Sequence, residues 1–177
     1  MRSLTKKYIH LAYIWDIIPD MGSILDRKNC ELLNLLQSDA SLAVENLADA
    51  VSLSRNACWR RIKAMEEAGL IKGRVALVDP EKAGLPLVAL VIVKTNQHEA
   101  GWLARFRAAV LEMPEIVAAW RMSGDLDYVL RVRLSSVAGY DAFYQRLIEQ
   151  VPMSDVSASF VLEEIKETTV VPVGLEA

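Results

Sequence analysis

The spacing of the apolar residues changes near residue 85, and this change constrains the fold more than any other feature of the chain. Before residue 85, apolar residues recur at the three- and four-residue intervals of amphipathic helices. After it, short apolar runs of strand length alternate with segments of helix length. A chain of 177 residues is long enough for two small domains. We therefore predict a helical N-terminal domain and a C-terminal domain that mixes strands and helices, an α+β fold.

The N-terminal half is predicted to form three helices with a short turn between the last two. The predicted helices lie at 25–37, 43–50 and 55–68. Ser54 is a natural N-cap for the third helix, and Gly69 is a natural stop after it. Residues 51–53 join the second and third helices tightly, as in a helix-turn-helix. The segment KGRVALV (72–78), which follows, is strand-like.

The third helix concentrates positive charge in a chain whose formal net charge is −3. Four of the twenty Lys and Arg residues fall within Arg55–Lys63. On a helical wheel of about 100° per residue, the apolar side consists of Cys58, Ile62 and Met65. The opposite, polar side consists of Asn56, Trp59, Arg60 and Lys63. Such a face suits a nucleic acid, but it is also typical of a solvated helix surface, and spacing alone leaves both interpretations open.

The C-terminal half has the order βαββαβ of a ferredoxin-like domain, with two helices on one face of an antiparallel sheet. The predicted strands are 85–93, 115–122, 126–134 and 156–165, and the predicted helices are 99–113 and 136–151. Ser123-Gly124-Asp125 is a hairpin signal between the second and third strands. The tail 168–173 is a candidate fifth, edge strand.

The first predicted strand, LPLVALVIV, is apolar on both faces. A sheet with helices on one face normally alternates apolar and polar residues, because its other face meets water. We therefore expect the open face to pack on a second copy of the chain; a central strand that is simply rich in valine is the alternative. Arg131 and Arg133 alternate with apolar residues in the third strand, so they either line the edge of that interface or are solvated.

The cysteines and histidines do not have the spacing of a metal site, and no cofactor motif is present. We interpret Cys30 and Cys58 as small apolar residues of a cytoplasmic protein. No run approaches the roughly 20 apolar residues of a membrane span. Residues 1–24 are assigned to an N-terminal extension: either the start codon lies upstream of the true one at Met21, or the arm packs on a neighbour through Tyr8, Leu11 and Trp15.

This arrangement resembles the leucine-responsive and asparagine-responsive transcription regulators, the Lrp/AsnC or feast/famine family. LDRKNCELLNLLQSDAS resembles the opening helix of the family, and LSRNACWRRIKAMEEAGLIKGRVALVDP resembles its recognition helix and hinge strand. MSGDLDYVLRV resembles the ligand-domain signature, with Leu126 in place of an aromatic residue. Ser52 stands where the family often has glycine; if that position has positive φ, serine costs roughly 1 kcal/mol there. Arg55-Asn56 replaces a frequent Pro-Thr, which leaves the operator sequence open.

The resemblance implies the following domains: an extension at 1–24, a winged helix-turn-helix domain at 25–74, a hinge strand and linker at 75–84, and a ferredoxin-like effector-binding and dimerisation domain at 85–177. The third helix would then enter the major groove of DNA. Asn56 and Arg60 suit adenine and guanine edges. Arg61 lies toward the inner flank, where it would hold a carboxylate or reach a phosphate. The expected DNA-binding residues are Ser54, Arg55, Asn56, Trp59, Arg60, Arg61, Lys63, Lys72 and Arg74.

The resemblance also implies a pocket for a small effector, typically an amino acid, between neighbouring dimers. The expected effector-binding residues are Ser123, Gly124, Asp125, Asp127 and Tyr128. Asp125 or Asp127 would pair with an α-ammonium group. A plain hairpin turn capped by Asp127 is the alternative.

The sequence therefore predicts a sequence-specific DNA-binding transcriptional regulator that responds to an amino acid through changes in oligomeric assembly. A homodimer is expected, and tetramer and octamer stay open. An amino-acid sensor without DNA binding is one rival. An enzyme similar to tetrapyrrole decarboxylases is the other; it would have only His98 in the ligand domain. We predict no catalytic residues, because no nucleophile–base pair, metal cluster or phosphate loop accompanies Asp125 and Asp127.

Overall fold

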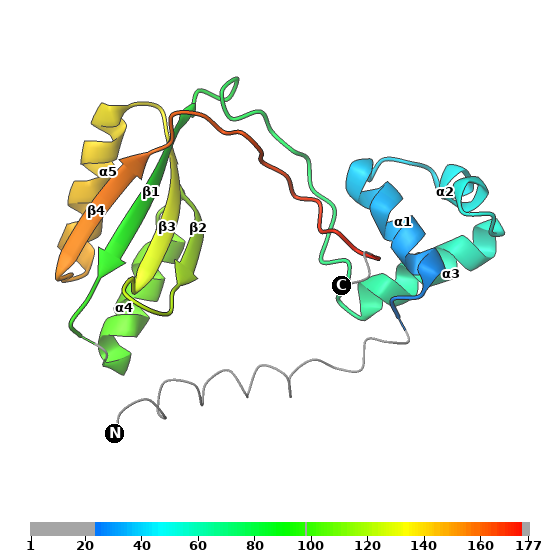
Figure 1. The fold of residues 1–177 in the computed structure, drawn as a ribbon, viewed down its shortest axis with the longest axis horizontal. Coiled ribbons are helices and arrows are strands. Elements are labelled where there is room, and N and C mark those ends of the chain that lie inside the picture. The colour runs from blue at the N-terminus through cyan, green and yellow to red at the C-terminus, as the bar shows by residue number, and fades with distance from the viewer. Residues whose placement is uncertain (1–23, 98, 175–177) are drawn as a thin grey trace, which may run out of the picture. The chain divides into compact units, whose positions relative to one another are not determined.

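The structure is a computed structural model that describes residues 24–97 and 99–174 (Figure 1). The predicted N-terminal extension, apart from Ile24, lies outside the described residues, and so does His98. Within the described part, the chain forms two compact units: 24–75 with 168–174, and 76–167. No described helix is long and apolar enough to cross a membrane.

The first unit is a three-helix domain. Its helices are α1 (Arg27–Ser38), α2 (Val44–Ala50) and α3 (Arg55–Glu67). The Ser54 side chain accepts a hydrogen bond from the Ala57 backbone N–H at 3.2 Å, which confirms the predicted N-cap. Just beyond α3, Gly69 has φ +72°, as expected of a residue that ends a helix. The core contains Leu32, Leu33, Leu36, Leu47, Ala48, Val51, Cys58, Ile62 and Met65.

The turn between α2 and α3 has a left-handed residue at its centre. Ser52 has φ +55° and is the one non-glycine residue with positive φ in the described part of the chain. The Leu53 backbone N–H donates to the Ala48 carbonyl at 2.9 Å and closes the turn. The short connection therefore depends on an unfavourable backbone conformation of serine.

The strand-like segment 72–78 is not a strand in this chain. Its side chains are exposed, Val75 to 79%. A strand needs a hydrogen-bonded neighbour for its backbone, and no described segment pairs with this one.

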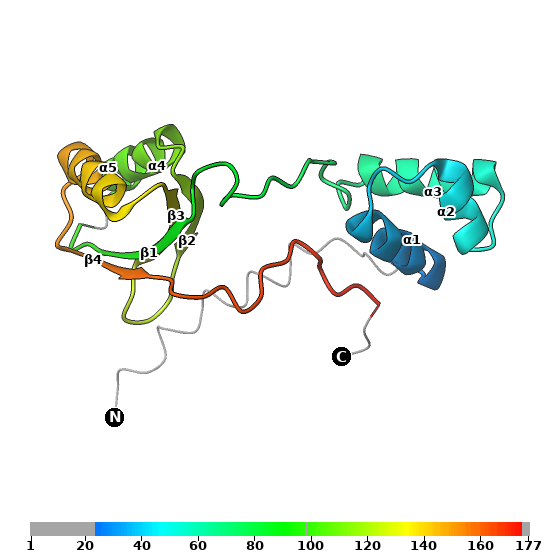
Figure 2. The same ribbon diagram turned by 90° about the horizontal axis from the view of Figure 1, so that it is seen from above.

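The second unit has the predicted order βαββαβ. Its elements are β1 (Leu87–Lys94), α4 (Ala100–Glu112), β2 (Ile116–Arg121), β3 (Tyr128–Leu134), α5 (Val137–Gln150) and β4 (Asp155–Phe160). The sheet is antiparallel with the order β2-β3-β1-β4. α4 and α5 cover one face of this sheet (Figure 2). Trp102 and Phe106 of α4 stack with ring centroids 5.1 Å apart and lie against Tyr128 of β3.

The other face of the sheet is partly apolar. Val88 is only 4% exposed, whereas Leu90 and Trp120 are exposed. Arg131 pairs with Glu167 at 2.6 Å, and Arg133 pairs with Glu167 at 2.7 Å and with Glu164 at 2.9 Å. These two arginines are therefore held by carboxylates of the segment that follows β4.

The tail 168–173 does not form the candidate fifth strand. The Gln37 side chain donates from Nε2 to the Val171 carbonyl at 3.1 Å and accepts from the Val171 N–H at 2.7 Å. The tail thus finds its donor and acceptor on α1 of the first unit instead of at a sheet edge.

Candidate nucleic-acid interface

One face of α3 carries polar and aromatic side chains to solvent. Asn56, Trp59, Arg60 and Lys63 are exposed, and Trp59 is 52% exposed although it is a large aromatic residue. The caps and the buried apolar side of the helix fix the direction of this face. The structure therefore brings together the four side chains that the helical wheel placed on one side.

A hollow of about 190 Å³ adjoins this face. It is lined by Val44 of α2 and by Arg55, Asn56 and Trp59 of α3. Arg55 Nε lies 2.5 Å from Glu45 Oε1 and so links the two helices. Both side chains are exposed, so the pair contributes little to stability.

Two of the expected DNA-binding cations share one carboxylate. Lys63 Nζ lies 2.8 Å from Glu66 Oε2, and Arg74 Nη2 lies 3.3 Å from Glu66 Oε1. The hydrogen bond from Lys63, followed by the charges of Lys63 and Arg74, lowers the pKa of Glu66 below its ordinary value. A phosphate that binds Lys63 or Arg74 would compete with an ionised carboxylate.

Arg61 is half-buried and reaches the start of α1. Its Nη1 lies 2.5 Å from Asp26 Oδ2 and 3.0 Å from Asn29 Oδ1. The hydrogen bond from Arg61 lowers the pKa of Asp26, and the Asn29 backbone N–H lowers it further. Of the two roles expected for Arg61, the structure shows the pairing with a neighbouring carboxylate.

The remaining expected residues differ in how they are engaged. The Ser54 hydroxyl is occupied by the cap of α3. Arg60 and Lys72 are exposed and form no ion pair with any residue that the structure describes. Arg60 therefore differs from Arg55 and Arg61, whose guanidinium groups are paired with carboxylates.

The expected effector loop divides into exposed and structural residues. Ser123, Gly124 and Asp125 are exposed, and Gly124 has φ +101°. Asp127 Oδ2 accepts a hydrogen bond from the Thr95 backbone N–H at 2.9 Å. Tyr128 is buried in the aromatic cluster with Trp102 and Phe106.

Three residues near the two sites are not among the residues that the sequence predicts. Glu66 could have been found, because it stands three residues after Lys63 on the same helix. Glu45 and Thr95 carry no local signal, since their contacts depend on how α2 meets α3 and on how β1 meets the β2–β3 loop. No group of three or more His, Cys, Asp or Glu side chains that could hold a metal occurs in the described part.

A helix-turn-helix with an exposed basic helix, followed by a ferredoxin-like domain, defines a class of two-domain transcriptional regulators. Residues 25–72 match the winged helix-turn-helix DNA-binding family, and residues 88–171 match the Lrp/AsnC ligand binding domain. The chain belongs to the Lrp/AsnC family of DNA-binding transcriptional regulators.

Individual relatives agree with this assignment. The chain is 47% identical over 151 residues to the DNA-binding transcriptional activator DecR of Escherichia coli K12, covering 85% of this chain and 99% of DecR. A crystal structure of an AsnC family regulator from Agrobacterium tumefaciens has 48% identity and a TM-score of 0.81, covering 83% of this chain and 96% of that one. A regulator from Neisseria meningitidis, solved as a complex with L-methionine, has 31% identity and a TM-score of 0.81, covering 85% and 97%.

Proposed function

We propose that a dimer of this chain binds operator DNA through the polar face of α3 and that an amino acid bound to the sheet domain regulates this binding. The observation that carries the DNA-binding part is the exposure of Asn56 and Arg60 on a helix whose apolar side is fully packed. Bases are read by such side chains in the major groove.

Asn56 and Arg60 are the proposed base-reading residues. Asn56 suits an adenine edge, and Arg60 suits a guanine edge. Trp59 lines the same hollow as Asn56 and offers apolar surface to the major groove. The proposed phosphate contacts are Arg55, Lys63, Lys72 and Arg74, with Ser54 at the start of the helix. Arg61 contributes indirectly, because its ion pair with Asp26 supports the orientation of α3.

The proposed effector site is the exposed part of the β2–β3 loop, Ser123–Asp125. The related regulator from Neisseria meningitidis was solved with L-methionine, which supports an amino acid as the class of effector. Asp125 is an exposed carboxylate suited to an α-ammonium group, and the positive φ of Gly124 allows close approach to the backbone. Asp127 and Tyr128 would support the conformation of this loop.

Dimer formation is proposed from the open face of the sheet. Leu90 and Trp120 expose apolar surface there, next to the nearly buried Val88. A second copy packed on this face would remove that surface from water. Two recognition helices could then occupy half-sites roughly 34 Å apart. Tetramers and octamers would form by further contacts between dimers.

The alternatives are disfavoured by particular residues. A sensor without DNA binding would have no use for the exposed basic face of α3. An acid–base enzyme would need both Asp125 and Asp127 for chemistry, yet Asp127 accepts a backbone hydrogen bond from Thr95. As a regulator of transcription, the protein would act in the cytoplasm, where bacterial DNA lies.

Selection from random duplex DNA, followed by sequencing, tests the DNA-binding proposal. We expect a recurring, nearly palindromic motif, and we expect Arg60→Ala to relax the preference at one base position in each half-site. A thermal-shift screen of the twenty amino acids on the same protein tests the effector. Failure to enrich any motif would refute DNA binding by α3, and a screen without any shift would refute the amino-acid effector.

A further inference from the structure

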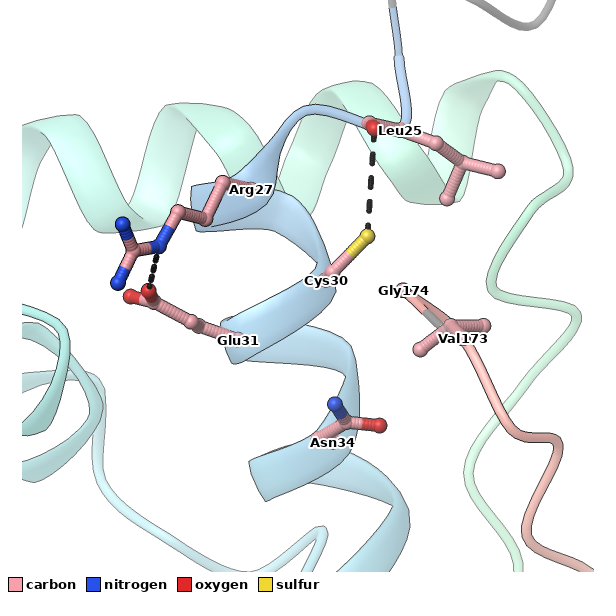
Figure 3. Close-up of a pocket in the computed structure, with 7 residues that line it drawn as sticks. All are labelled: Leu25, Arg27, Cys30, Glu31, Asn34, Val173 and Gly174. Atoms are coloured by element: carbon pink, nitrogen blue, oxygen red, sulfur yellow. Dashed lines mark hydrogen bonds and ion pairs between the residues drawn. The ribbon is translucent and has the colours of Figure 1, made fainter. Parts of the chain in front are cut away.

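The face of α1 that points away from α2 is occupied by the C-terminal segment of the chain. Cys30 and Asn34 lie on this face. Together with Val173 and Gly174 of the C-terminal segment, they line a groove (Figure 3). Gln37, one turn further along α1, holds Val171. The first unit of the fold therefore includes a segment that follows the whole sheet domain in the sequence.

The contact is specific in three ways. The Gln37 carboxamide donates to the carbonyl and accepts from the N–H of the same residue, Val171, as a neighbouring strand would. Val173 packs against the apolar core of the three-helix domain. Gly174 has φ +78°, and a Cβ atom there would lie 3.1 Å from Cys30 Cβ. Together these contacts fix the position of the segment along α1.

The same segment is also fixed at its other end. Glu167 pairs with Arg131 and Arg133 of β3, within the sheet domain. Only three residues lie between Glu167 and Val171, and the four residue steps from one to the other span at most about 14 Å when extended. The chain leaves the helical domain through residues 76–86 and returns to it through this shorter connection.

We propose that α1 is a docking surface for the C-terminal segment 168–174 and that the docked segment is a second tether, which restricts how the helical domain can turn relative to the sheet domain. This inference rests on the proposed binding of a dimer to DNA. A protein with two tethers loses less orientational freedom when both recognition helices bind one duplex. It also binds tightly over a narrower range of half-site spacings, because a short linker spans a narrow range of distances.

The test measures DNA affinity as a function of half-site spacing. The probes are duplexes that carry the selected operator with 0 to about 6 bp, roughly half a helical turn, inserted between its half-sites. We compare the full-length chain with Gln37→Ala, which removes both hydrogen bonds to Val171, and with Gly174→Ala, which places a Cβ against Cys30. Ser38→Ala is the matched control, since Ser38 is an exposed neighbour of Gln37 on α1 that does not line the groove, and its hydroxyl donates to the Asn34 carbonyl within the same helix.

Release of the tail is measured independently by hydrogen exchange of the Val171 amide, which should become faster in Gln37→Ala and stay slow in Ser38→Ala. Circular dichroism verifies that each variant is folded. Gln37→Glu is a milder variant, because its carboxylate still accepts from the Val171 N–H but cannot donate to the carbonyl.

The expected result is a loss of discrimination between spacings. Insertion of half a turn should weaken binding of the original chain and of Ser38→Ala on the order of tenfold, and should weaken binding of the two released variants much less. An equal loss of affinity at every spacing would overturn the inference, because the tail would then only stabilise the helical domain. Rapid exchange of Val171 in the original chain would overturn it as well. If the original chain selects no DNA at all, the proposed function fails first, and the two failures are thus distinguished.

Discussion

The guanidinium of Arg61 on α3 lies 2.5 Å from the carboxylate of Asp26, which caps α1. Asp26 also accepts the Asn29 backbone N–H at 2.8 Å, so a single carboxylate both caps the first helix and holds the recognition helix. The direction in which α3 presents its polar face therefore depends partly on a residue 35 positions earlier in the chain.

Asp26→Ala should lower the free energy of unfolding of the helical domain by about 1–2 kcal/mol. Loss of an N-cap costs about 1 kcal/mol, and the ion pair adds only a fraction because both side chains are partly exposed. Asp26→Asn should cost less than about 1 kcal/mol, since an amide oxygen can still cap the helix. Urea denaturation followed by far-UV circular dichroism measures both variants. Equal losses in the two variants would mean that the negative charge of Asp26, and not its capping of α1, accounts for the whole effect.

The same carboxylate should make stability depend on pH. The hydrogen bond from Arg61 holds the pKa of Asp26 below 3.8, its ordinary value. Because the pKa is lower in the folded state, the stabilisation is present above the ordinary value and is lost as the pH falls through the folded-state pKa. The difference in unfolding free energy between the original chain and Asp26→Asn should therefore shrink as the pH is lowered below about 4. A difference that grows on acidification would contradict this linkage.

Ser52→Gly should raise the free energy of unfolding by up to about 1 kcal/mol, because glycine adopts positive φ without a Cβ clash. Ser52 has φ +55° in the turn before α3. The control is Ser135→Gly, at an exposed serine that is not among the positive-φ residues; it should lower stability slightly. Thermal unfolding of both variants measures the effect. Destabilisation by Ser52→Gly would show that the hydroxyl matters more than the backbone strain.

The elements with local signals could be predicted from the sequence, and those with distant partners could not. The boundaries of α3 follow from Ser54 and Gly69, and the order βαββαβ follows from the spacing of apolar residues. The tail was expected as a strand because valine and threonine favour strands, yet its partner Gln37 lies 134 positions away. Likewise, the segment 72–78 has strand-like residues but no described partner.

The candidate DNA site likewise has features that the sequence predicts and features that depend on distant contacts. Its exposed face follows from helical periodicity, which places Arg60 on the polar side whatever surrounds the helix. Which cations are already paired depends on tertiary contacts: Glu45 of α2 binds Arg55, and no pattern within α3 reveals this. Sequence alone therefore identifies the surface and could identify the local pair of Lys63 with Glu66, but not the pair of Arg55 with Glu45 on another helix.

Glu66→Gln should strengthen binding to all DNA sequences by up to about fivefold. Lys63 and Arg74 could then bind phosphate without first breaking their ion pairs with the Glu66 carboxylate. Glu67→Gln is the matched control: it changes the net charge equally, but Glu67 forms no ion pair with a described residue. Fluorescence anisotropy with operator and random duplexes measures both. Weaker binding by Glu66→Gln alone would mean that Glu66 positions the two cations instead of competing for them.

Asp125→Ala and Asp127→Ala should have different effects. Asp125 is exposed, so its loss should change stability by less than about 0.5 kcal/mol while removing the thermal shift caused by the effector. Asp127→Ala should lower the unfolding free energy by about 1–2 kcal/mol, because the backbone N–H of the buried Thr95 loses its acceptor. Thermal shifts with and without the amino acid separate the two roles. A normal effector response in Asp125→Ala would mean that another residue binds the ammonium group.

Arg60→Ala and Lys63→Ala should separate base reading from phosphate binding. If each subunit neutralises two or three phosphates, the slope of log K against log salt for the dimer should be about −4 to −5. Lys63→Ala should weaken all sequences alike and reduce this slope by about 2, one for each subunit. Arg60→Ala should lower operator affinity by about 1–3 kcal/mol per bidentate contact and relax the preference at one base position in each half-site. Anisotropy titrations over a range of salt concentrations measure both quantities, and the reverse pattern would exchange the two assignments on the α3 face.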